Sequence, residues 1–358
     1  MNFNFYLIKS LRILLFPFSL LYGVAIIIRN YLFDRNILKS ASFNLPIISV
    51  GNLSVGGTGK SPMVEYLLRL LKDNYEIATL SRGYKRKTKG YALAHANTTA
   101  LDIGDEPMQF HNKFPDVAIA VGEERVVAIP QLLHDRPQTQ VIILDDAYQH
   151  RTIRAGLNIL LTECSNLFTR DFFLPTGDLR DERSSYERAQ VIVVTKCPAD
   201  LPLEEKARLI KEIKPKPKQQ IFFTSIEYGQ PYHIISKQQR RITQHDEVLL
   251  VCGLANPAPL KNYLATQAKT YYQQTFSDHH IFTIDDLEEI QKQLDNISAD
   301  KKMIITTEKD AVRLDKFSSE LRDLPVYVLP VQHCFLFNEG MQFDTTVNTF
   351  IKNFNITQ

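Results

Sequence analysis

From residue 46 onward, short runs of apolar residues alternate with longer segments in which apolar residues recur every three or four positions. The short runs are rich in β-branched residues and have the length of buried strands. Strands that alternate with helices form βαβ units, in which a mostly parallel sheet carries helices on both faces. The chain is therefore predicted to have an α/β fold, with candidate strands at residues 46–50, 77–80, 117–121, 141–144, 157–162 and 191–195.

A lysine- and proline-rich stretch, KEIKPKPKQQ at residues 211–220, interrupts this alternation and indicates a domain boundary. The segment QIFFTSIEYGQPYHIIS that follows is interpreted as two paired strands around the turn Gly229-Gln230-Pro231. A second α/β series then begins, with candidate strands at residues 248–251, 303–306 and 326–329. The pattern predicts four parts: an N-terminal helix at residues 1–30, a domain with the first sheet at 31–215, a two-stranded linker at 216–245 and a smaller α/β domain at 246–358.

The N-terminal part of the chain carries one long apolar run, from Ile13 to Ile28. As a helix this run spans about 24 Å, which is less than the roughly 30 Å of a bilayer's hydrocarbon core. The run is therefore predicted to be a helix that lies in the face of a membrane; a buried core helix and a true membrane span remain the alternatives. The flanking cations suit the anionic cytoplasmic leaflet: Lys9, Arg12, Arg29, Arg35 and Lys39.

A glycine-rich segment joins the first candidate strand to the helix that follows it. This helix is predicted because Val64, Leu67, Leu68 and Leu71 recur at helical spacing. Such a turn points backbone N–H groups and a helix N-terminus at one spot, which favours phosphate. The segment fits the pattern G-x-x-x-x-G-K-[ST] except at its first position, and it predicts a nucleotide site formed by Ser54, Val55, Gly56, Gly57, Thr58, Gly59, Lys60 and Ser61.

Within this segment, Lys60 is expected to reach the β- and γ-phosphates and Ser61 to contact Mg²⁺. The alternative is a simple turn between a strand and a helix. Asp145 and Asp146 follow the buried strand in VIILDD, and a strand that ends in a carboxylate beside a phosphate loop is how P-loop proteins hold Mg²⁺. Either aspartate or both are candidate ligands, although an aspartate in this place often only caps a turn or a helix.

Two further tracts carry residues suited to act on a hydroxyl group. Asp105, in IGDEPMQF, lies where a loop is expected to enter a helix, so that it either caps this helix or acts as a base. His279 follows Asp278 in FSDHHIF; a carboxylate–histidine pair that orients a base is favoured over a metal site, because adjacent histidines do not share a face. The basic run SRGYKRKTKGY, at residues 81–91, is predicted to face an anion, with a solvated run of charges as the alternative.

Composition narrows the class of protein. The 358 residues carry 42 Lys and Arg against 40 Asp and Glu, a formal net charge of +2, so that no global attraction to nucleic acid is expected. The chain is long enough for two domains. Four scattered cysteines form no C-x-x-C pair and fit free thiols in a reducing cytoplasm: Cys164, Cys197, Cys252 and Cys334.

In this order the tracts resemble the tetraacyldisaccharide 4′-kinase family of lipid A biosynthesis. The resemblance implies a P-loop kinase that transfers the γ-phosphate of ATP to the 4′-hydroxyl of an acylated glucosamine disaccharide 1-phosphate, at the cytoplasmic face of the inner membrane. The expected partners are this lipid and the membrane surface, not nucleic acid, and the chain is expected to be a monomer. The motifs are S-V-G-N-L-S-V-G-G-T-G-K-S, S-R-G-Y, G-D-E-P, D-D-x-x-Q-H, L-P-x-G-x-L-R at 174–180, G-L-A-N-P at 253–257, D-H at 278–279 and T-T-E-K-D-A-V-R-L at 306–314.

The resemblance also implies roles for individual residues. Asp105 and His279 would form the pair that prepares the hydroxyl group, and Asp145 and Asp146 would serve Mg²⁺. The family's phosphate loop carries serine at its first position, as this chain does at Ser54.

Two positions depart from the family's pattern. Ala147 stands where glycine is usual after the two aspartates. The motif L-P-x-G-x-L-R-E reads LPTGDLRDE here, which leaves open whether Asp181 or Glu182 takes the place of the family's glutamate.

Three other classes of protein fit less well. A P-loop GTPase should carry a guanine-reading N-K-x-D motif, and the nearest tract, VTKCPAD at residues 194–200, lacks the asparagine. An ATP-dependent ligase gives no reason for an apolar N-terminus. A membrane-interaction protein with a degenerate loop is disfavoured by the intact Gly59-Lys60-Ser61 and the paired aspartates.

Overall fold

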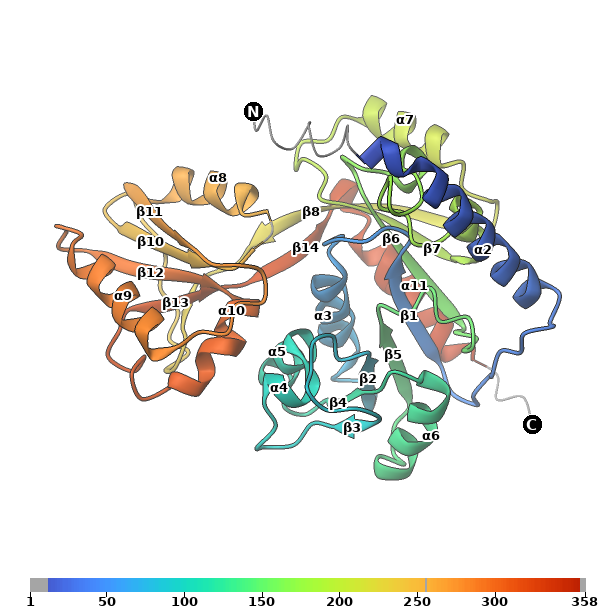
Figure 1. The fold of residues 1–358 in the computed structure, drawn as a ribbon, viewed down its shortest axis with the longest axis horizontal. Coiled ribbons are helices and arrows are strands. Elements are labelled where there is room, and N and C mark those ends of the chain that lie inside the picture. The colour runs from blue at the N-terminus through green and yellow to red at the C-terminus, as the bar shows by residue number, and fades with distance from the viewer. Residues whose placement is uncertain (1–11, 255, 355–358) are drawn as a thin grey trace.

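The computed structural model describes residues 12–254 and 256–354, which fold into two α/β units joined by a two-stranded ribbon (Figure 1). The larger unit contains a nine-stranded sheet and the smaller unit a five-stranded sheet. Both sheets are mostly parallel and have helices on both faces. The predicted α/β fold class is therefore confirmed, while the pairing of strands near the ribbon differs from the prediction.

The large sheet has the strand order β14-β8-β7-β6-β1-β5-β2-β4-β3. Neighbouring strands are parallel except at the two edges, where β14 and β3 are antiparallel to their neighbours. Because β1 pairs directly with β5, the segments that follow these two strands leave the sheet at the same edge. The strands are β1 (Ile47–Asn52), β2 (Ile77–Ser81), β3 (Ala92–Leu93), β4 (Ala118–Val121), β5 (Val141–Asp145), β6 (Leu157–Glu163), β7 (Val191–Thr195), β8 (Gln220–Tyr228) and β14 (Val331–Phe335).

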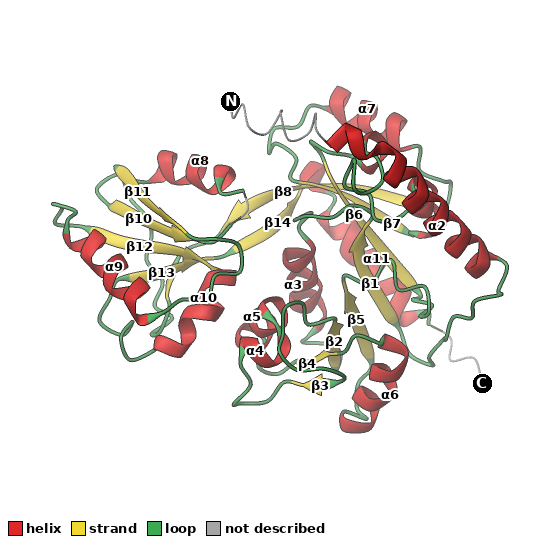
Figure 2. Cartoon of the chain, in the orientation of Figure 1, coloured by secondary structure: helices red, strands yellow, loops and turns green. Residues whose placement is uncertain are grey.

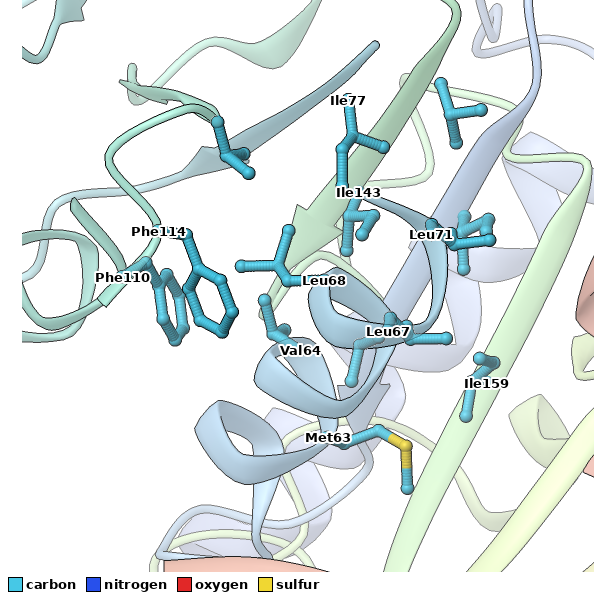
Figure 3. Close-up of a cluster of buried hydrophobic side chains, with 14 of the residues drawn as sticks. Met63, Val64, Leu67, Leu68, Leu71, Ile77, Phe110, Phe114, Ile143 and Ile159 are labelled. Atoms are coloured by element: carbon cyan, nitrogen blue, oxygen red, sulfur yellow. The ribbon is translucent and has the colours of Figure 1, made fainter. Parts of the chain in front are cut away.

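Helices cover both faces of the large sheet, because successive residues of a strand point to opposite sides. Helices α3 (Lys60–Leu71), α5 (Asp105–Lys113) and α11 (Gly340–Lys352) share a core with one face, and α6 (Arg125–Asp135) and α7 (Leu203–Ile213) pack on the other. A short helix, α4 (Ala100–Ile103), precedes α5. Figure 3 shows the buried side chains of α3 in one cluster with Phe110 and Phe114 and with Ile143 and Ile159 of the sheet. The buried residues of α3 in this cluster are Met63, Val64, Leu67, Leu68 and Leu71.

The smaller unit repeats this arrangement around its own core. Its sheet has the order β11-β10-β12-β13-β9, with β9 antiparallel to β13. Helix α8 (Ala258–Gln267) packs on one face, and α9 (Ile284–Asp295) and α10 (Glu308–Leu314) on the other. Helix α10 also contacts α5 of the large unit, so that the two units meet there as well as at the ribbon (Figure 1). The strands are β9 (Tyr232–His233), β10 (Glu247–Cys252), β11 (Thr270–Thr275), β12 (Lys302–Thr307) and β13 (Val326–Leu329).

The ribbon between the units is built from β8 and β14, as Figure 2 shows. The sequence predicted that β8 would pair with the strand after the Gly229 turn, and this pairing is wrong. Tyr228 pairs instead with Val331, and the Gly229 N–H group donates to the Pro330 carbonyl oxygen at 2.9 Å. The chain then continues into β9, which joins the small sheet. An apolar pattern identifies a strand but not a partner that lies one hundred residues away.

The last part of the chain returns to the large unit. Phe343, Val347 and Ile351 of α11 are buried in the same core as α3 and α5. The structure thus differs from the predicted second domain at residues 246–358, because β14 and α11 belong to the large unit. This return was not predictable from the sequence, since α11 has an ordinary amphipathic pattern.

Helix α2 (Phe16–Asp34) follows a 3₁₀ turn at Ile13–Leu15 and lies along the outside of the large unit (Figure 1). Its buried residues are mostly small or polar: Ser19, Gly23, Asn30 and Phe33. Its outward side carries exposed apolar residues, which is the reverse of an ordinary surface helix. This exposure argues against the buried core helix. The outward apolar residues include Phe18, Leu20, Leu21, Val24, Ile27 and Ile28.

The segment Ile13–Asp34 is longer than the predicted apolar run, and by length and composition it is sufficient to cross a membrane. The extra length arises because the helix continues beyond Ile28 to Asp34, through a mixture of polar and apolar residues. Of the predicted flanking cations, Lys9 lies outside the described residues.

Candidate active site

The glycine-rich loop connects β1 to α3 and takes a path that requires glycine. Gly56 and Gly59 have positive φ angles of 107° and 86°, which side chains with a Cβ atom rarely adopt. Gly59 immediately precedes α3, whose first residue is Lys60. A Cβ atom on Gly56 or Gly57 would meet no atom of the described residues within 4 Å, so that the loop is open on this side. The backbone at the start of α3 therefore faces an open space in which an anion can bind.

Three neighbouring elements hold the loop in place. The Val55 N–H group donates to the Asp178 carbonyl oxygen at 2.8 Å. The Thr195 hydroxyl group, at the end of β7, donates to the Thr58 carbonyl oxygen at 2.9 Å. His333 Nε2, on β14, lies 2.9 Å from the Gly59 carbonyl oxygen. Two of these bonds are made to carbonyl groups of the loop and one to the Val55 N–H group. The N–H groups of Val55 and Thr58 are therefore used within the fold, and a ligand would be bound by other N–H groups of the loop.

Lys60 and the two predicted aspartates lie together at this edge of the sheet. Lys60 Nζ is 3.3 Å from Asn52 Oδ1 and 3.7 Å from Asp146 Oδ1. Burial lowers the pKa of Lys60, and the charge of Asp146 opposes this shift. Burial alone would raise the pKa of Asp146, but the charges of Lys60 and Arg180 outweigh it and lower the pKa to about 2. Asp146 is therefore ionised at neutral pH.

Arg180 is the second cation at Asp146. Its guanidinium group bonds both carboxylate oxygens of Asp146, with 3.1 Å between Nη1 and Oδ2, and its Nη2 lies 2.5 Å from Asn52 Oδ1. The sequence placed Arg180 in a family motif but assigned no role to it. Its position between Asp146 and the loop suits it to hold negative charge there.

Asp145 is buried and differs from Asp146 in its partners. Its Oδ1 atom has no hydrogen-bond partner among the residues that the structure describes. Burial, and next the negative charge of Asp146, raise the pKa of Asp145 to about 7. A carboxylate oxygen that is buried and unpartnered beside a second carboxylate is suited to a hard divalent cation. Ser61, in the first turn of α3, is the third predicted metal contact and carries the hydroxyl group that this site would use.

The structure brings Asp105 and His279 together, although 174 positions separate them in the chain. Asp105 is the first residue of α5 in the large unit, and His279 lies in the small unit after β11. His279 Nδ1 is 2.7 Å from Asp105 Oδ2, and Arg313 Nε donates to Asp105 Oδ1 at 2.8 Å. Both carboxylate oxygens are thus oriented by the small unit.

The other ring nitrogen of His279 fixes its tautomer. Lys309 Nζ, which can only donate, lies 3.1 Å from His279 Nε2. His279 Nε2 therefore accepts, and Nδ1 carries the hydrogen that is donated to Asp105. Lys309 is itself paired with Asp278 at 2.7 Å. His280, the neighbouring histidine, points elsewhere and bonds Asp286 at 2.9 Å.

The basic run at residues 81–91 contributes less to the site than predicted. Arg86 is paired with Glu123 at 2.7 Å, and its side chain is almost fully buried. Arg86 therefore has a structural role. Arg82, Lys85, Lys87 and Lys89 are exposed. The prediction of an anion-facing role stays open for these residues.

Arg125 and His150 lie near the site without a role predicted for them: Arg125 belongs to no motif, and His150 is the last residue of the family motif D-D-x-x-Q-H. Arg125 is fully buried, and its Nη1 atom donates to the Gly122 carbonyl oxygen at 2.8 Å. Burial lowers the pKa of Arg125 to about 10, and Asp145 opposes this shift. His150 follows the paired aspartates, and burial together with Arg125 lowers its pKa to about 4. Both residues place positive or polar groups near the two aspartates.

Helix α2 is bonded to the segment that supports the phosphate loop. Ser19 of α2 bonds Thr176 at 2.7 Å, and Arg12, just before the 3₁₀ turn that leads into α2, donates from Nε to the Pro175 carbonyl oxygen at 2.8 Å. Thr176 and Asp178 lie in the same tract, and Asp178 accepts from the loop. The outer helix and the phosphate loop therefore share one supporting segment.

Asn30 of α2 contacts both Asp181 and Glu182, the two residues that could take the place of the family's glutamate. Its Nδ2 atom is 2.8 Å from Asp181 Oδ1 and 2.7 Å from Glu182 Oε1. Asp181 also pairs with Arg188 at 2.8 Å and accepts from Ser185. Both acidic residues thus attach α2 to the large unit, and Asp181 also bonds Ser185 and Arg188.

We expect the substitution Asn30→Leu to lower the free energy of unfolding by about 1–3 kcal/mol, because the carboxylates of Asp181 and Glu182 each lose one charge-assisted hydrogen bond. The measurement is urea-induced unfolding of the purified protein. Leu21→Ala on the exposed side of the same helix is the control and should change the value by less than about 0.5 kcal/mol. Equal stability of Asn30→Leu and the unsubstituted protein would mean that α2 is not held by this contact.

Comparisons with known proteins agree with the geometry. The sequence model of the family described as LpxK, tetraacyldisaccharide-1-P 4′-kinase, matches residues 11–352. The tetraacyldisaccharide 4′-kinase of Flavobacterium johnsoniae is 49% identical over 345 residues, which are 96% of this chain and 98% of that protein. The corresponding protein of Phocaeicola vulgatus is 42% identical over 94% of both chains. A crystal structure of LpxK from Aquifex aeolicus in complex with ATP has a TM-score of 0.75 and 28% identity, and the match covers 95% of this chain and 99% of that chain.

Proposed function

The chain belongs to the tetraacyldisaccharide-1-P 4′-kinase family, and we propose that it acts through an active site assembled between its two units. The reaction is the transfer of the γ-phosphate of ATP to the 4′-hydroxyl of tetraacyldisaccharide 1-phosphate, in lipid A biosynthesis. The observation that carries the proposed site is the Asp105–His279 contact, 2.7 Å long, between a unit that holds a phosphate loop and a unit that does not. This site is complete within one chain, which supports action as a monomer.

The ATP side of the reaction is assigned to the loop Ser54–Ser61. Its N–H groups other than those of Val55 and Thr58 would bind the phosphates together with the N-terminus of α3, and Lys60 would neutralise the charge of the transferring group. Lys60 is suited to this because Asn52 and Asp146 already hold its side chain at the mouth of the loop. Positioning and charge neutralisation are most of what phosphoryl transfer needs.

The metal side is assigned to Asp145, Asp146 and Ser61. The unpartnered Oδ1 of Asp145 supports this assignment, because a buried carboxylate oxygen without a donor is costly unless a cation binds it. Mg²⁺ held there would neutralise charge on the β- and γ-phosphate oxygens. Asp146 keeps its own negative charge through Lys60 and Arg180.

The acceptor side is assigned to Asp105, with His279 as its partner. Asp105 would accept the proton of the 4′-hydroxyl as this oxygen attacks the γ-phosphorus. The Nδ1–H group of His279 and the guanidinium group of Arg313 hold the carboxylate, so that its orientation is set before the acceptor arrives. Lys309 keeps His279 in the tautomer that donates to Asp105.

An acceptor-dependence experiment tests this assignment of the reaction. ADP release is measured from ATP and Mg²⁺ with and without detergent-dispersed tetraacyldisaccharide 1-phosphate. A kinase should release ADP rapidly only when the acceptor is present, and ATP should be preferred over GTP. Equal release without the acceptor, or preference for GTP, would favour a nucleotide-hydrolysing switch instead.

The membrane surface is proposed as the place of action, on the cytoplasmic side where ATP is available. The support comes from α2, whose apolar residues face outward while its polar side is bonded to the large unit. A lipid substrate with acyl chains leaves a bilayer only at a high cost in free energy. A helix lying in the membrane face would bring the phosphate loop to this substrate, because both are attached to the tract at residues 175–182.

We expect the double substitution Leu21→Glu and Ile28→Glu to release most of the protein from vesicles of anionic phospholipid. The two side chains are 70% and 53% exposed, so that the charges should enter without disturbing the fold. Co-sedimentation with the vesicles measures the bound fraction. Met341→Glu, at an apolar residue of α11 that is 82% exposed, is the control and should leave binding unchanged. Undiminished binding of the double variant would mean that α2 does not enter the membrane.

A further inference from the structure

His333 connects the ribbon to the phosphate loop. It lies in the middle of β14, only 4% exposed, and four residues after the last strand of the small sheet. Its Nε2 atom is 2.9 Å from the Gly59 carbonyl oxygen, and its Nδ1 atom is 2.9 Å from the Thr224 hydroxyl oxygen on β8. The ring therefore spans from the neighbouring strand to the residue before Lys60.

These two partners define the state of the ring. A backbone carbonyl oxygen can only accept, so that Nε2 carries a hydrogen and donates it to Gly59. Nδ1 is then the acceptor, and the Thr224 hydroxyl group donates to it. Burial, the largest influence, lowers the pKa of His333 to about 4, so that the ring is neutral at neutral pH. Both ring nitrogens are satisfied in this single arrangement.

The bond to Gly59 bears on the orientation of one peptide group. The carbonyl group of Gly59 and the N–H group of Lys60 belong to the same planar trans peptide and point in opposite directions. A donor that fixes the carbonyl oxygen therefore also fixes the direction of the Lys60 N–H group. This N–H group belongs to the first turn of α3, where N–H groups have no carbonyl partner within the helix. Gly59, at a φ of 86°, has the backbone freedom to rotate this peptide. The other donor to this oxygen, the Met63 N–H group, is more distant at 3.2 Å.

We propose that His333 is a positioning residue for nucleotide binding, which holds the Gly59–Lys60 peptide so that the Lys60 N–H group faces the phosphates of ATP. The inference rests on the proposed function of the loop Ser54–Ser61 as the ATP site. The close approach of the ring to the loop is consistent with it, because a Cβ atom on Gly59 would lie 3.0 Å from His333 Cε1 and Nε2. His333 thus makes nucleotide affinity depend on the ribbon that carries the small unit.

A histidine elsewhere in the chain provides a matched comparison. His233, on β9, has its Nε2 atom 2.9 Å from the Leu324 carbonyl oxygen. It makes the same type of bond in the small unit, without contacting the phosphate loop. If histidines of this type only support the fold, His333 and His233 should be equivalent in every measurement except the size of the loss of stability.

The experiment compares His333→Leu, His333→Gln and His233→Leu with the unsubstituted protein, using full-length chains in detergent. Isothermal titration gives the Kd of MgADP and of magnesium with a non-hydrolysable ATP analogue, and thermal unfolding gives Tm. His333→Leu should weaken both nucleotides about ten-fold, which is the scale of one lost hydrogen bond. His333→Gln, whose amide nitrogen can donate to Gly59, should stay within about two-fold, and His233→Leu should lower only Tm.

Unchanged nucleotide Kd values in His333→Leu would overturn the inference, as would a loss in His333→Gln as large as that in His333→Leu. If His333→Leu does not fold, Thr224→Val decides the question, because it removes the hydroxyl group that orients the ring. A weakened Kd in that variant supports the inference and an unchanged Kd overturns it. An unsubstituted protein that binds neither nucleotide would contradict the proposed ATP site itself, which is a distinguishable result.

Discussion

Replacing Lys60 by alanine is expected to lower kcat by at least about 10³-fold while the protein stays folded. The ammonium group of Lys60 lies at the mouth of the phosphate loop, 3.7 Å from Asp146. Its removal takes away the positive charge that would meet the transferring phosphoryl group. Asp146 keeps a cationic partner in Arg180, so that no buried charge is left unpaired. Steady-state turnover of the acceptor, together with circular dichroism, measures the two parts of this prediction.

The control for this variant is Lys72→Ala, at the residue that follows the same helix. Lys72 is exposed and forms an ion pair with its neighbour Asp73, so that its loss should leave kcat unchanged. Near-normal kcat in Lys60→Ala, with an unchanged circular dichroism spectrum, would remove Lys60 from the reaction.

The second large effect is expected at the contact between the two units. Asp105→Ala and His279→Ala should each lower kcat by about 10²–10⁴-fold, because general bases contribute on this scale. The double variant should be scarcely slower than the slower single variant, since the two side chains act as one unit through a 2.7 Å contact. The Kd of MgADP should change little, because neither side chain contacts the loop Ser54–Ser61 in the described structure.

His280→Ala is the control that distinguishes a specific role of His279 from a general disturbance of the small unit. His280 lies beside His279 in the chain, yet it bonds Asp286 and stacks on Phe276, away from Asp105. Its loss should change kcat by less than the loss of His279. Fully multiplicative losses in the double variant would mean that Asp105 and His279 act separately, and unchanged rates in the single variants would leave both as structural residues.

The sequence was sufficient to predict most strands of the two sheets and the helix after the phosphate loop. These elements have strong local patterns: the residues from Met63 to Leu71 repeat at helical spacing, and all five residues of β5 are buried. The pairing of β8 with β14 was not predictable in this way. Only β8 was among the predicted strands, and the pairing depends on where the small unit is inserted between β8 and β14.

In the candidate site, too, local motifs were predictable and contacts between distant residues were not. The loop Ser54–Ser61 and the pair Asp145–Asp146 are local motifs, and residues alone identified them as candidates. The pairing of Asp105 with His279 followed from the family resemblance only, because no local pattern links residues in different units. His333 and Arg125 gave no signal, since a single histidine in a strand and a single arginine in a helix are ordinary features.

In helix α2 the apolar run was predictable from the sequence, but the contacts of its polar residues were not. Its apolar run was recognised, and its exposed side is consistent with the predicted membrane face. The role of Asn30 was not recognised, because an asparagine near the end of an apolar run resembles a simple boundary. Only the fold brings Asp181 and Glu182 within hydrogen-bonding distance of it.

The most direct test of the proposed reaction follows the phosphate itself. The full-length protein is incubated with γ-labelled ATP, Mg²⁺ and detergent-dispersed tetraacyldisaccharide 1-phosphate, and the lipid product is analysed for the position of the label. We predict one labelled phosphate on the 4′-hydroxyl, formed in proportion to the ADP released and absent with Lys60→Ala. Label at another position, or ADP released while the lipid stays unlabelled, would contradict the assignment.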